Sequence, residues 1–144
     1  MAKSALQSWK HFELDWACVE PNTSVEKGTN FCVCARILRG FPWVAMPLQI
    51  VFVNDTAFGS NNEKGRFDFG SGTLCGHLLA GEERFSIQWD KDDRVWYEIS
   101  SFSKPAHFLS ALGYPIVKSM QTNFSMGSIH ALLKHMTDHH ERQE

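Results

Sequence analysis

The sequence predicts an α+β fold in which a curved antiparallel sheet of about six strands packs against a long C-terminal helix. Segments of alternating hydrophobicity dominate residues 12–103, and residues 105–138 carry apolar side chains at the three- and four-residue spacing of helices. A helix laid over one face of the sheet covers both apolar surfaces at once. At 144 residues the chain can bury one core, so we expect residues 1–144 to form a single domain.

The composition argues against several classes of function. The 14 basic and 16 acidic residues give a net charge of −2, and no cluster of Lys and Arg predicts nucleic-acid binding. The first residues lack the basic and apolar regions of a secretory signal, which predicts a protein that is not secreted. The most apolar window, residues 41–53, is too short to cross a bilayer as a helix.

The N-terminal part is expected to form the end of a helix and then three strands. Leu6, Trp9 and Phe12 have helical spacing, but few residues precede them. The segments FELDWACV and NFCVCARIL flank a polar loop and predict strands. Alternation places four residues of the second segment on one face: Phe31, Val33, Ala35 and Ile37. The run LQIVFVND predicts a third strand, buried on both faces, before a loop at TAFGSNNEKG.

Residues 66–103 predict a meander of three strands, RFDFGSGTLCGHLL, EERFSIQWD and RVWYEISSFS. A two-residue turn at Ala80 and Gly81 is expected to place Leu78 opposite Glu83. A three-residue turn at residues 91–93 creates further pairs: Trp89 with Val95, Ile87 with Tyr97, and Phe85 with Ile99. Both registers send the same side chains to the same face, which supports the assignment.

The C-terminal part predicts two helices. Gly113 is expected to end a short helix, and Pro115 suits the first turn of a longer helix that runs to about Asp138. Five residues form an apolar stripe at helical spacing: Leu109, Leu112, Ile116, Met120 and Phe124.

The charged residues of the run GEER are expected on opposite faces of the sheet, because alternate residues of a strand point to opposite sides. Glu82 and Arg84 are expected on the outer face, where Arg84 reaches Glu98 across the hairpin. The same face is expected to hold His77, Cys75 and Ser86. Glu83 alone points to the apolar face, where a carboxylate must be hydrogen-bonded, paired or protonated. Three partners for Glu83 remain open: water at the end of the strand, the hydroxyl of Ser101, or a bound molecule.

A cavity between the sheet and the C-terminal helix is the candidate binding site. The side chains expected to line it come from both elements: Glu83, Phe85, Ile87, Trp89, Tyr97, Ile99, Ser101, Leu112, Tyr114, Ile116 and Met120. No pair of a nucleophile and a base is forced together by its spacing, so the sequence favours a protein without enzymatic activity.

The sequence contains no motif for a cofactor and no convincing metal site. Cys32 and Cys34 project to one side of a strand, but no second pair of cysteines accompanies them, which predicts reduced, buried thiols. His135 and His139 lie four residues apart near a helix C-terminus, a place that the helix dipole also explains. No phosphate-binding loop and no dinucleotide-binding fingerprint occurs.

Four segments together resemble the plant branch of uncharacterised protein family 0548. These segments are ALQSWKHFELDW, WVAMPLQIVFV, GSGTLCGHLLAGEERFSI and VWYEISSFSKPAHFLSALGYPIVKSMQ, and the resemblance covers roughly residues 5–135. Members of the family carry a further N-terminal segment, which the resemblance implies is missing here. Most members have no assigned activity, so the resemblance implies no catalytic residues.

The resemblance and the predicted fold imply competing functions. The meander followed by a long helix is similar to the helix-grip architecture of START and Bet v 1-like proteins, which enclose lipids or other apolar molecules. Plant members of the family have been associated with a cation-permeable pore of the plastid outer envelope, and a pore built from this chain requires oligomers or a helix-lined path. Some helix-grip proteins are cyclases or hydrolases with an inward carboxylate. The chain is therefore expected in the plastid outer envelope or the cytoplasm, with association to a membrane surface and homo-oligomers left open.

Overall fold

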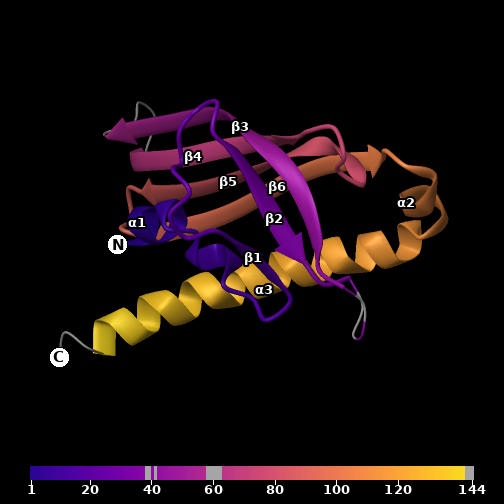
Figure 1. Cartoon of the computed structure of the whole chain (residues 1–144). Coiled ribbons are helices and arrows are strands. Elements are labelled where there is room, and N and C mark those ends of the chain that lie inside the picture. The colour runs from indigo at the N-terminus through magenta and orange to yellow at the C-terminus, as the bar shows by residue number, and fades with distance from the viewer. Residues whose placement is uncertain (38–39, 41, 58–62, 142–144) are drawn as a thin grey trace.

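The computed structural model describes residues 1–37, 40, 42–57 and 63–141. It contains six strands and four helical segments in the order α1, η1, β1 to β6, α2 and α3 (Figure 1). The strands are β1 (Ala17–Val19), β2 (Asn30–Ala35), β3 (Val44–Ala57), β4 (Glu63–Thr73), β5 (Leu79–Asp90) and β6 (Val95–Pro105). The helices are α1 (Ala2–Gln7), the 3₁₀ turn η1 (Lys10–Phe12), α2 (Phe108–Leu112) and α3 (Tyr114–Glu141).

The six strands form one antiparallel sheet in which each strand pairs with its neighbours in the sequence. The sheet curves over α3, which confirms the predicted α+β, helix-grip-like fold (Figure 1). The register of the β5–β6 hairpin is also as predicted, with three apolar pairs: Trp89 with Val95, Ile87 with Tyr97, and Phe85 with Ile99. Alternation and turn length therefore suffice to place this hairpin.

The predicted turn between β4 and β5 is wrong. Ala80 and Gly81 lie inside β5, and the connection is residues 74–78, where Gly76 has a φ of +93°. Glu83 is consequently opposite Ser71, not Leu78. The apolar residues of LCGHLL suggested a continued strand, but β4 ends at Thr73 and the positive φ of Gly76 turns the chain back toward β5.

The third strand differs from its prediction in length and burial. It runs from Val44 to Ala57 and contains a register shift between Ile50 and Phe52. Only Leu48 and Ile50 among its described side chains are fully buried, so it is not covered on both faces. Residues 58–62 of the predicted loop that follows lie outside the described residues.

The N-terminal segment packs between the sheet and α3. Trp9 takes a left-handed backbone conformation with a φ of 58°, which ends α1 and turns the chain into η1. The Trp9 ring packs edge-on against Phe69 of β4 at 5.5 Å between centroids. The ring centroid of Phe12 lies 5.8 Å from that of Phe85 on β5 and 4.7 Å from that of Phe124 on α3. One side chain therefore contacts both the sheet and the helix.

The two C-terminal helices are separated by Gly113, and α3 ends at Glu141. The predicted apolar stripe is only partly correct: Met120 and Phe124 are half-buried, whereas Leu109, Leu112 and Ile116 are exposed. The cause is that α2 and the first turn of α3 extend beyond the sheet (Figure 1). None of the helices in the described part of the chain has the length and hydropathy needed to span a membrane.

Candidate functional site

The inner face of the sheet changes from large to small side chains along the strands. Two rows running from β4 across β5 to β6 are bulky: Phe67, Ile87 and Tyr97, then Phe69, Phe85 and Ile99. The next rows are small or polar: Ser71, Glu83 and Ser101, then Thr73, Gly81 and Ser103. The bulky rows pack against Trp9, His11 and Phe12. The small rows leave space below α3.

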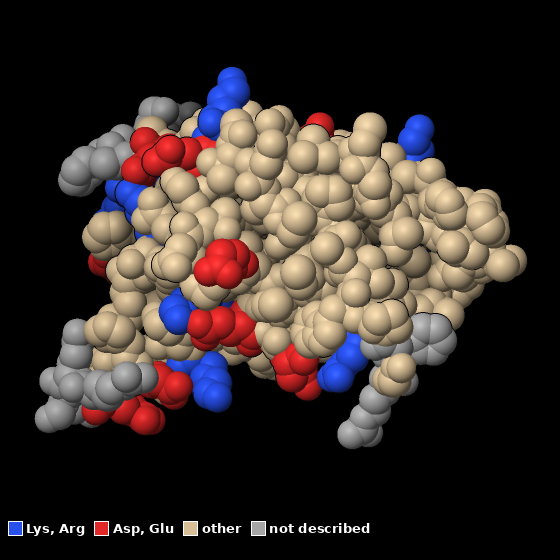
Figure 2. Space-filling view, in the orientation of Figure 1, with Lys and Arg blue, Asp and Glu red and all other residues tan. Residues whose placement is uncertain are grey.

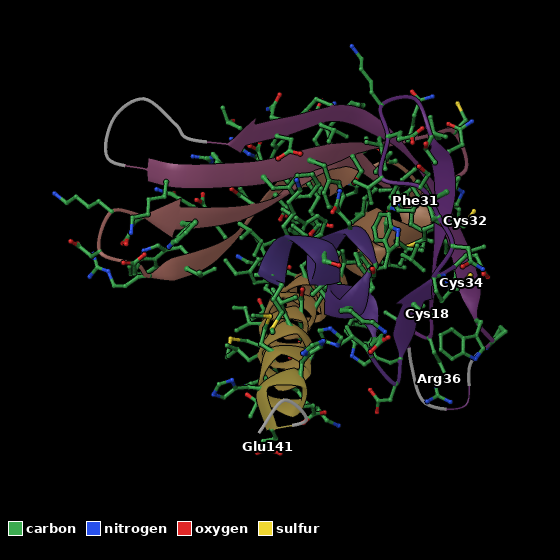
Figure 3. The ribbon with its side chains drawn as sticks, turned by 90° about the vertical axis from the view of Figure 1, so that its left-hand side faces the viewer. Cys18, Phe31, Cys32, Cys34, Arg36 and Glu141 are labelled. Carbon is green, nitrogen blue, oxygen red and sulfur yellow. The ribbon has the colours of Figure 1, made fainter. Side chains whose placement is uncertain are left out.

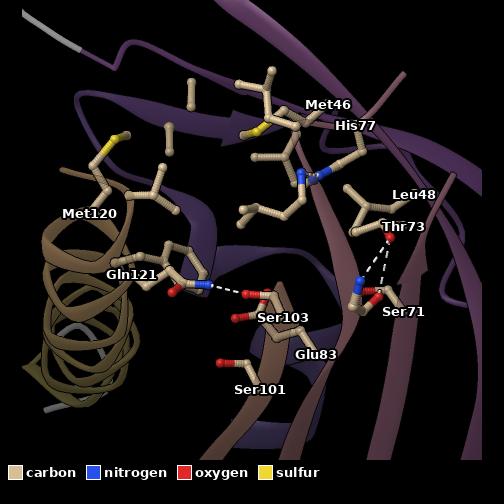
Figure 4. Close-up of a pocket in the computed structure, with 18 of the residues that line it drawn as sticks. Met46, Leu48, Ser71, Thr73, His77, Glu83, Ser101, Ser103, Met120 and Gln121 are labelled. Atoms are coloured by element: carbon tan, nitrogen blue, oxygen red, sulfur yellow. Dashed lines mark hydrogen bonds between the residues drawn. The ribbon is translucent and has the colours of Figure 1, made fainter. Parts of the chain in front are cut away.

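That space is a cavity of about 170 Å³ (Figure 4). Its lining is mostly apolar and includes Phe12, Trp16, Ala17, Val33, Ala35, Ile37, Met46, Leu48, Leu78, Leu79, Val117, Met120 and Phe124. A few polar side chains interrupt this lining: Ser71, Thr73, His77, Glu82, Glu83, Ser101, Ser103 and Gln121. An apolar cavity with few polar groups is typical of sites for small molecules.

Glu83 is the acidic group on the inner wall of the cavity. It lies in β5 between Ser71 of β4 and Ser101 of β6. Among the described residues, no hydrogen bond or ion pair reaches its carboxylate. Burial raises the pKa of Glu83 from 4.5 to about 7, because the charged form is poorly solvated in this environment. A large fraction of Glu83 is therefore protonated at neutral pH.

Some of the other polar groups that line the cavity form hydrogen bonds within the protein (Figure 4). The amide nitrogen of Gln121 on α3 donates to Oγ of Ser103 on β6 at 2.8 Å. The backbone N–H of Leu79 donates to Nδ1 of His77 at 2.9 Å, so neutral His77 carries its hydrogen on Nε2. Burial lowers the pKa of His77, which favours this neutral form.

The cavity lining is more exposed on the β6 side of Glu83 than on the β4 side. Ser71, on the β4 side of Glu83, is only 2% exposed, whereas Ser101 on the β6 side is exposed. Glu83 lies between the two and is partly accessible. A molecule that enters beside β6 would meet the Glu83 carboxyl before it reached the closed end.

The structure brings only some of the predicted pocket residues together. Glu83, Ser101 and Met120 line the cavity. Phe85, Ile87, Tyr97 and Ile99 instead belong to or pack against the core that holds η1. Trp89, Leu112, Tyr114 and Ile116 are exposed and lie outside the cavity lining. The prediction placed the strand residues on the correct, inner face of the sheet. It did not distinguish the part of that face that packs against η1 from the part that lines the cavity.

Several expectations for the outer face are wrong. Arg84 forms its ion pair with Asp68 of β4, at 2.9 Å, rather than with Glu98. His77 lines the cavity instead of the outer face, because it lies in the β4–β5 connection and not in a strand. Glu82 is exposed as expected, yet it also borders the cavity.

Sequence reasoning missed Ser103 and Gln121, which come from different elements and meet only in the folded chain. A usable signal was present for the sheet residues. The small side chains Ser71, Thr73 and Gly81 occupy positions where the preceding rows carry aromatic rings, and such a gap in side-chain volume predicts a cavity.

The four cysteines are free thiols, as predicted, but they are not buried. Cys18, Cys32 and Cys75 are exposed and Cys34 is half-buried. The rings of His135 and His139 lie 6.3 Å apart. Within residues 1–37, 40, 42–57 and 63–141, no three His, Cys, Asp or Glu side chains are arranged to hold a metal ion.

Comparison with known proteins places this fold in a family without a known function. The model of a domain of unknown function, DUF1990, matches residues 1–131. A UPF0548 protein of Arabidopsis thaliana is 56% identical over 134 residues, which cover 93% of this chain and 64% of that protein. UPF0548 proteins of Dictyostelium discoideum and Deinococcus radiodurans are 36% and 42% identical, over 92% and 83% of this chain.

The chain spans between 62% and 64% of the length of these curated relatives. No solved structure matches the chain significantly. The family model and the three relatives agree: the chain carries a DUF1990 domain and belongs to the UPF0548 family.

Proposed function

We propose that this protein binds a small, mainly apolar molecule in the cavity between the sheet and α3, and that Glu83 holds a polar group of that molecule. The observation that supports this function is the Glu83 carboxyl, which has no hydrogen-bond or ion-pair partner among the described residues and lies in a mostly apolar cavity. A fully buried polar group that lacks a hydrogen bond costs about 1–3 kcal/mol, and the half-buried Glu83 carboxyl costs a part of this. A bound molecule that supplies the bond removes this cost.

The size of the cavity limits the molecule. An apolar protein cavity of about 150 Å³ is known to hold benzene, and this cavity measures about 170 Å³. A single ring or a short branched chain fits inside, whereas a longer chain must extend past β6 into solvent. Phe12, Met120 and Phe124 supply apolar contacts from η1 and α3.

The protonation state of Glu83 indicates which polar group the bound molecule carries. With a pKa of about 7, the carboxyl is largely neutral below that pH and both donates and accepts a hydrogen bond. A hydroxyl or a carbonyl group satisfies it without a charge having to be buried. We therefore expect the natural ligand to be neutral, with one hydroxyl or carbonyl group at the end that reaches Glu83.

The proposal is tested with two probes that differ by one hydroxyl group, 4-methylphenol and toluene. Amide chemical shifts of the ¹⁵N-labelled protein at pH 6 report the affinity of each probe and the residues that respond. Wild-type protein should shift at β5, β6 and the first half of α3, and should bind 4-methylphenol on the order of tenfold more tightly, a difference of about 1.4 kcal/mol.

Two variants separate the role of Glu83 from general effects of charge. Glu83→Leu should remove the preference for 4-methylphenol while it keeps or improves toluene binding. Glu98→Leu is the matched control, because Glu98 is an exposed carboxylate on β6 outside the cavity lining. If neither probe shifts the cavity residues, or if Glu83→Leu keeps the wild-type preference, the proposed function is wrong.

A second candidate function is association with an anionic lipid surface, through apolar side chains around α2. Five side chains, which we call the α2 patch, are unusually exposed: Phe102 67%, Phe108 69%, Leu109 56%, Leu112 81% and Ile116 46%. The end of the molecule formed by α2 shows no acidic side chain in Figure 2. Large exposed apolar patches mark contacts with proteins or membranes.

Charge favours a lipid surface over a second copy of the chain. Residues 99–137 contain Lys104, Lys118 and Lys134 but no Asp or Glu. Each Lys near an anionic membrane contributes about 1 kcal/mol of attraction, whereas two like-charged patches repel. The α2 patch also adjoins the cavity, since its member Phe102 borders it.

Sedimentation with vesicles tests this second candidate. The protein should pellet with phosphatidylglycerol–phosphatidylcholine vesicles and much less with phosphatidylcholine alone, and Leu112→Glu should weaken pelleting. Leu133→Glu, at an exposed residue in the C-terminal half of α3, should not. A concentration-dependent dimer that Leu112→Glu abolishes, without vesicle binding, would instead assign the patch to a second copy.

A further inference from the structure

Three thiols lie on the outer face of the first two strands, away from the cavity. Cys18 of β1 is paired directly with Cys34 of β2 in the antiparallel register. Cys32 precedes Cys34 by two residues and therefore projects to the same face. Figure 3 shows the three side chains along one side of this ladder. Their neighbours Ala17, Val33 and Ala35 point inward and line the cavity, so the outer thiols and the cavity share two strands.

The pairing of Cys18 with Cys34 places the two thiols within reach of a covalent bond. The backbone N–H of Arg36 donates to the carbonyl of Trp16 at 2.8 Å. Because pair types alternate along an antiparallel ladder, Cys18 and Cys34 also form a hydrogen-bonded pair, for which the Cα separation is about 5.5 Å. Disulfides have their most common Cα separation at about 5.5–6 Å. The Cβ atoms of a hydrogen-bonded pair lie nearer about 5.5 Å than the roughly 3.5–4.5 Å found in disulfides. The short edge strand β1 must therefore shift toward β2 for the bond to close, and such a bond is easily reduced.

The thiols are close enough for their charges to influence one another, and small molecules can reach two of them. The pKa of Cys34 is raised, first by burial and then by the neighbouring charges of Cys18 and Cys32. Cys18 and Cys32 are exposed, so a small thiol reagent has access to both. A directly opposed partner, however, exists only for the Cys18–Cys34 pair in the described register.

We propose that Cys18 and Cys34 form a redox-active dithiol that closes to a disulfide by exchange with a low-molecular-weight disulfide. The Cys18 thiolate attacks one sulfur of the small disulfide, a mixed disulfide forms, and the first small thiolate leaves. Cys34 then gives its proton to water and attacks the Cys18 sulfur, which expels the second small thiolate. The two cysteine sulfurs are oxidised by one electron each, and the small disulfide is reduced to two thiols.

The bond has a structural consequence for the edge of the sheet. The edge strand β1 has only three residues and pairs with β2 alone. A short edge strand opens easily, because few hydrogen bonds hold it. A covalent link in its centre keeps it on β2, together with Ala17 and the adjacent Trp16, which both line the cavity. Oxidation therefore stiffens one wall of the cavity.

Incubation of the folded, reduced protein with oxidised glutathione tests the proposal. Intact mass should fall by the mass of two hydrogen atoms, and peptide mapping should place the link between Cys18 and Cys34. In Cys34→Ser the second step is missing, so a stable glutathione adduct should remain on Cys18. Cys32→Ser and Cys75→Ser should still form the disulfide, since neither residue takes part.

Hydrogen exchange provides a second measurement that does not depend on any ligand. The backbone amides of Cys18 and Arg36, which point across the β1–β2 ladder, should exchange more slowly in the oxidised protein than in the reduced protein, and dithiothreitol should reverse the effect. The proposal is overturned if wild-type protein carries only glutathione adducts, if the link maps to Cys32 or Cys75, or if Cys34→Ser still loses two hydrogen atoms.

Discussion

The hydroxyl of Tyr97 on β6 lies 2.8 Å from Oγ of Ser128 on α3. Tyr97 is half-buried and Ser128 has no exposed surface, so the bond forms inside the layer between sheet and helix. Few other direct contacts join α3 to β6, since η1 occupies much of the space between the sheet and the helix. This hydrogen bond therefore fixes the distance between α3 and β6 in the packed half of the layer, beside the cavity rather than within it.

We expect Tyr97→Phe and Ser128→Ala each to reduce the free energy of unfolding by about 1–2 kcal/mol, because each leaves the partner hydroxyl buried without a hydrogen bond. The double variant should cost less than the sum of the two, since no unpaired hydroxyl remains. Urea denaturation followed by tryptophan fluorescence measures all four proteins of the cycle. Strict additivity would show that the two hydroxyl groups contribute independently, against the geometry.

Much of the fold follows from local pattern alone. Alternation of apolar residues and a short turn placed the β5–β6 hairpin in its observed register, and Gly113 with Pro115 located the boundary between α2 and α3. These features depend on residues close together in the sequence. The prediction of the β4–β5 connection was wrong because the apolar residues of this connection have the pattern of a strand. The backbone conformation of Gly76 is what distinguishes the turn.

The site was harder to predict, because it depends on what fills the concave face. Glu83 was correctly placed on that face, but Phe85 and Tyr97 share it and still lie in the packed half. The difference arises from α1 and η1, whose Trp9, His11 and Phe12 pack on the bulky rows and stop before Glu83. A contact between residues some 70 positions apart cannot be inferred from periodicity, as the pairing of His11 with Phe85 shows.

His11 should make the protein sensitive to acid. It has no exposed surface, neither ring nitrogen has a hydrogen-bond partner in the described part of the chain, and burial lowers its pKa to about 3. Since the unfolded chain binds the proton at pH 6.5, stability contributed by neutral His11 is lost as the pH falls from 6.5 toward 3, by about 1.4 kcal/mol per pH unit. His11→Leu should remove this loss, as urea midpoints from pH 7 to pH 4.5 will show.

Glu83 should have the opposite effect. Its pKa is raised to about 7 in the folded protein from 4.5, so the folded state binds the proton more tightly and stability is lost as the pH rises from 4.5 through 7. The slope is at most about 1.4 kcal/mol per pH unit and is reduced by water in the cavity. Glu83→Gln should flatten this loss relative to wild type, whereas Glu98→Gln, at an exposed site, should leave the profile unchanged.

The two groups therefore oppose each other between pH 4.5 and 6.5. In this pH range the contributions of His11 and Glu83 to the free energy of unfolding should nearly cancel in the wild-type protein. A variant that removes one residue should show the pH dependence that the other residue contributes. His11→Leu alone should lose stability as the pH rises, and Glu83→Gln alone should gain it. Parallel profiles for the two variants would contradict the assignment of either group.

Gly81 should be the least replaceable glycine near the cavity. A Cβ atom on Gly81 would lie 2.1 Å from the carbonyl oxygen of Phe102 and 2.7 Å from Cα of Ser103, both in the backbone of β6. Backbone atoms cannot rotate away as a side chain can, so β6 must separate from β5. We expect Gly81→Ala to reduce the free energy of unfolding by about 3 kcal/mol, at the upper end of the cost of overpacking.

Gly72 is the matched control, because it lies on the neighbouring strand opposite Glu82. A Cβ atom there would meet Val51 at 3.4 Å and Glu82 at 3.9 Å, which are ordinary contacts with side chains. Gly72→Ala should therefore be neutral or stabilising by about 0.5–1 kcal/mol, since Ala loses less backbone entropy than Gly. Equal stability of the two variants would mean that β6 does not pass this close to Gly81. Such a result would also mean that Ser103 lies farther from Gly81, and its hydrogen bond with Gln121 would then have a different position.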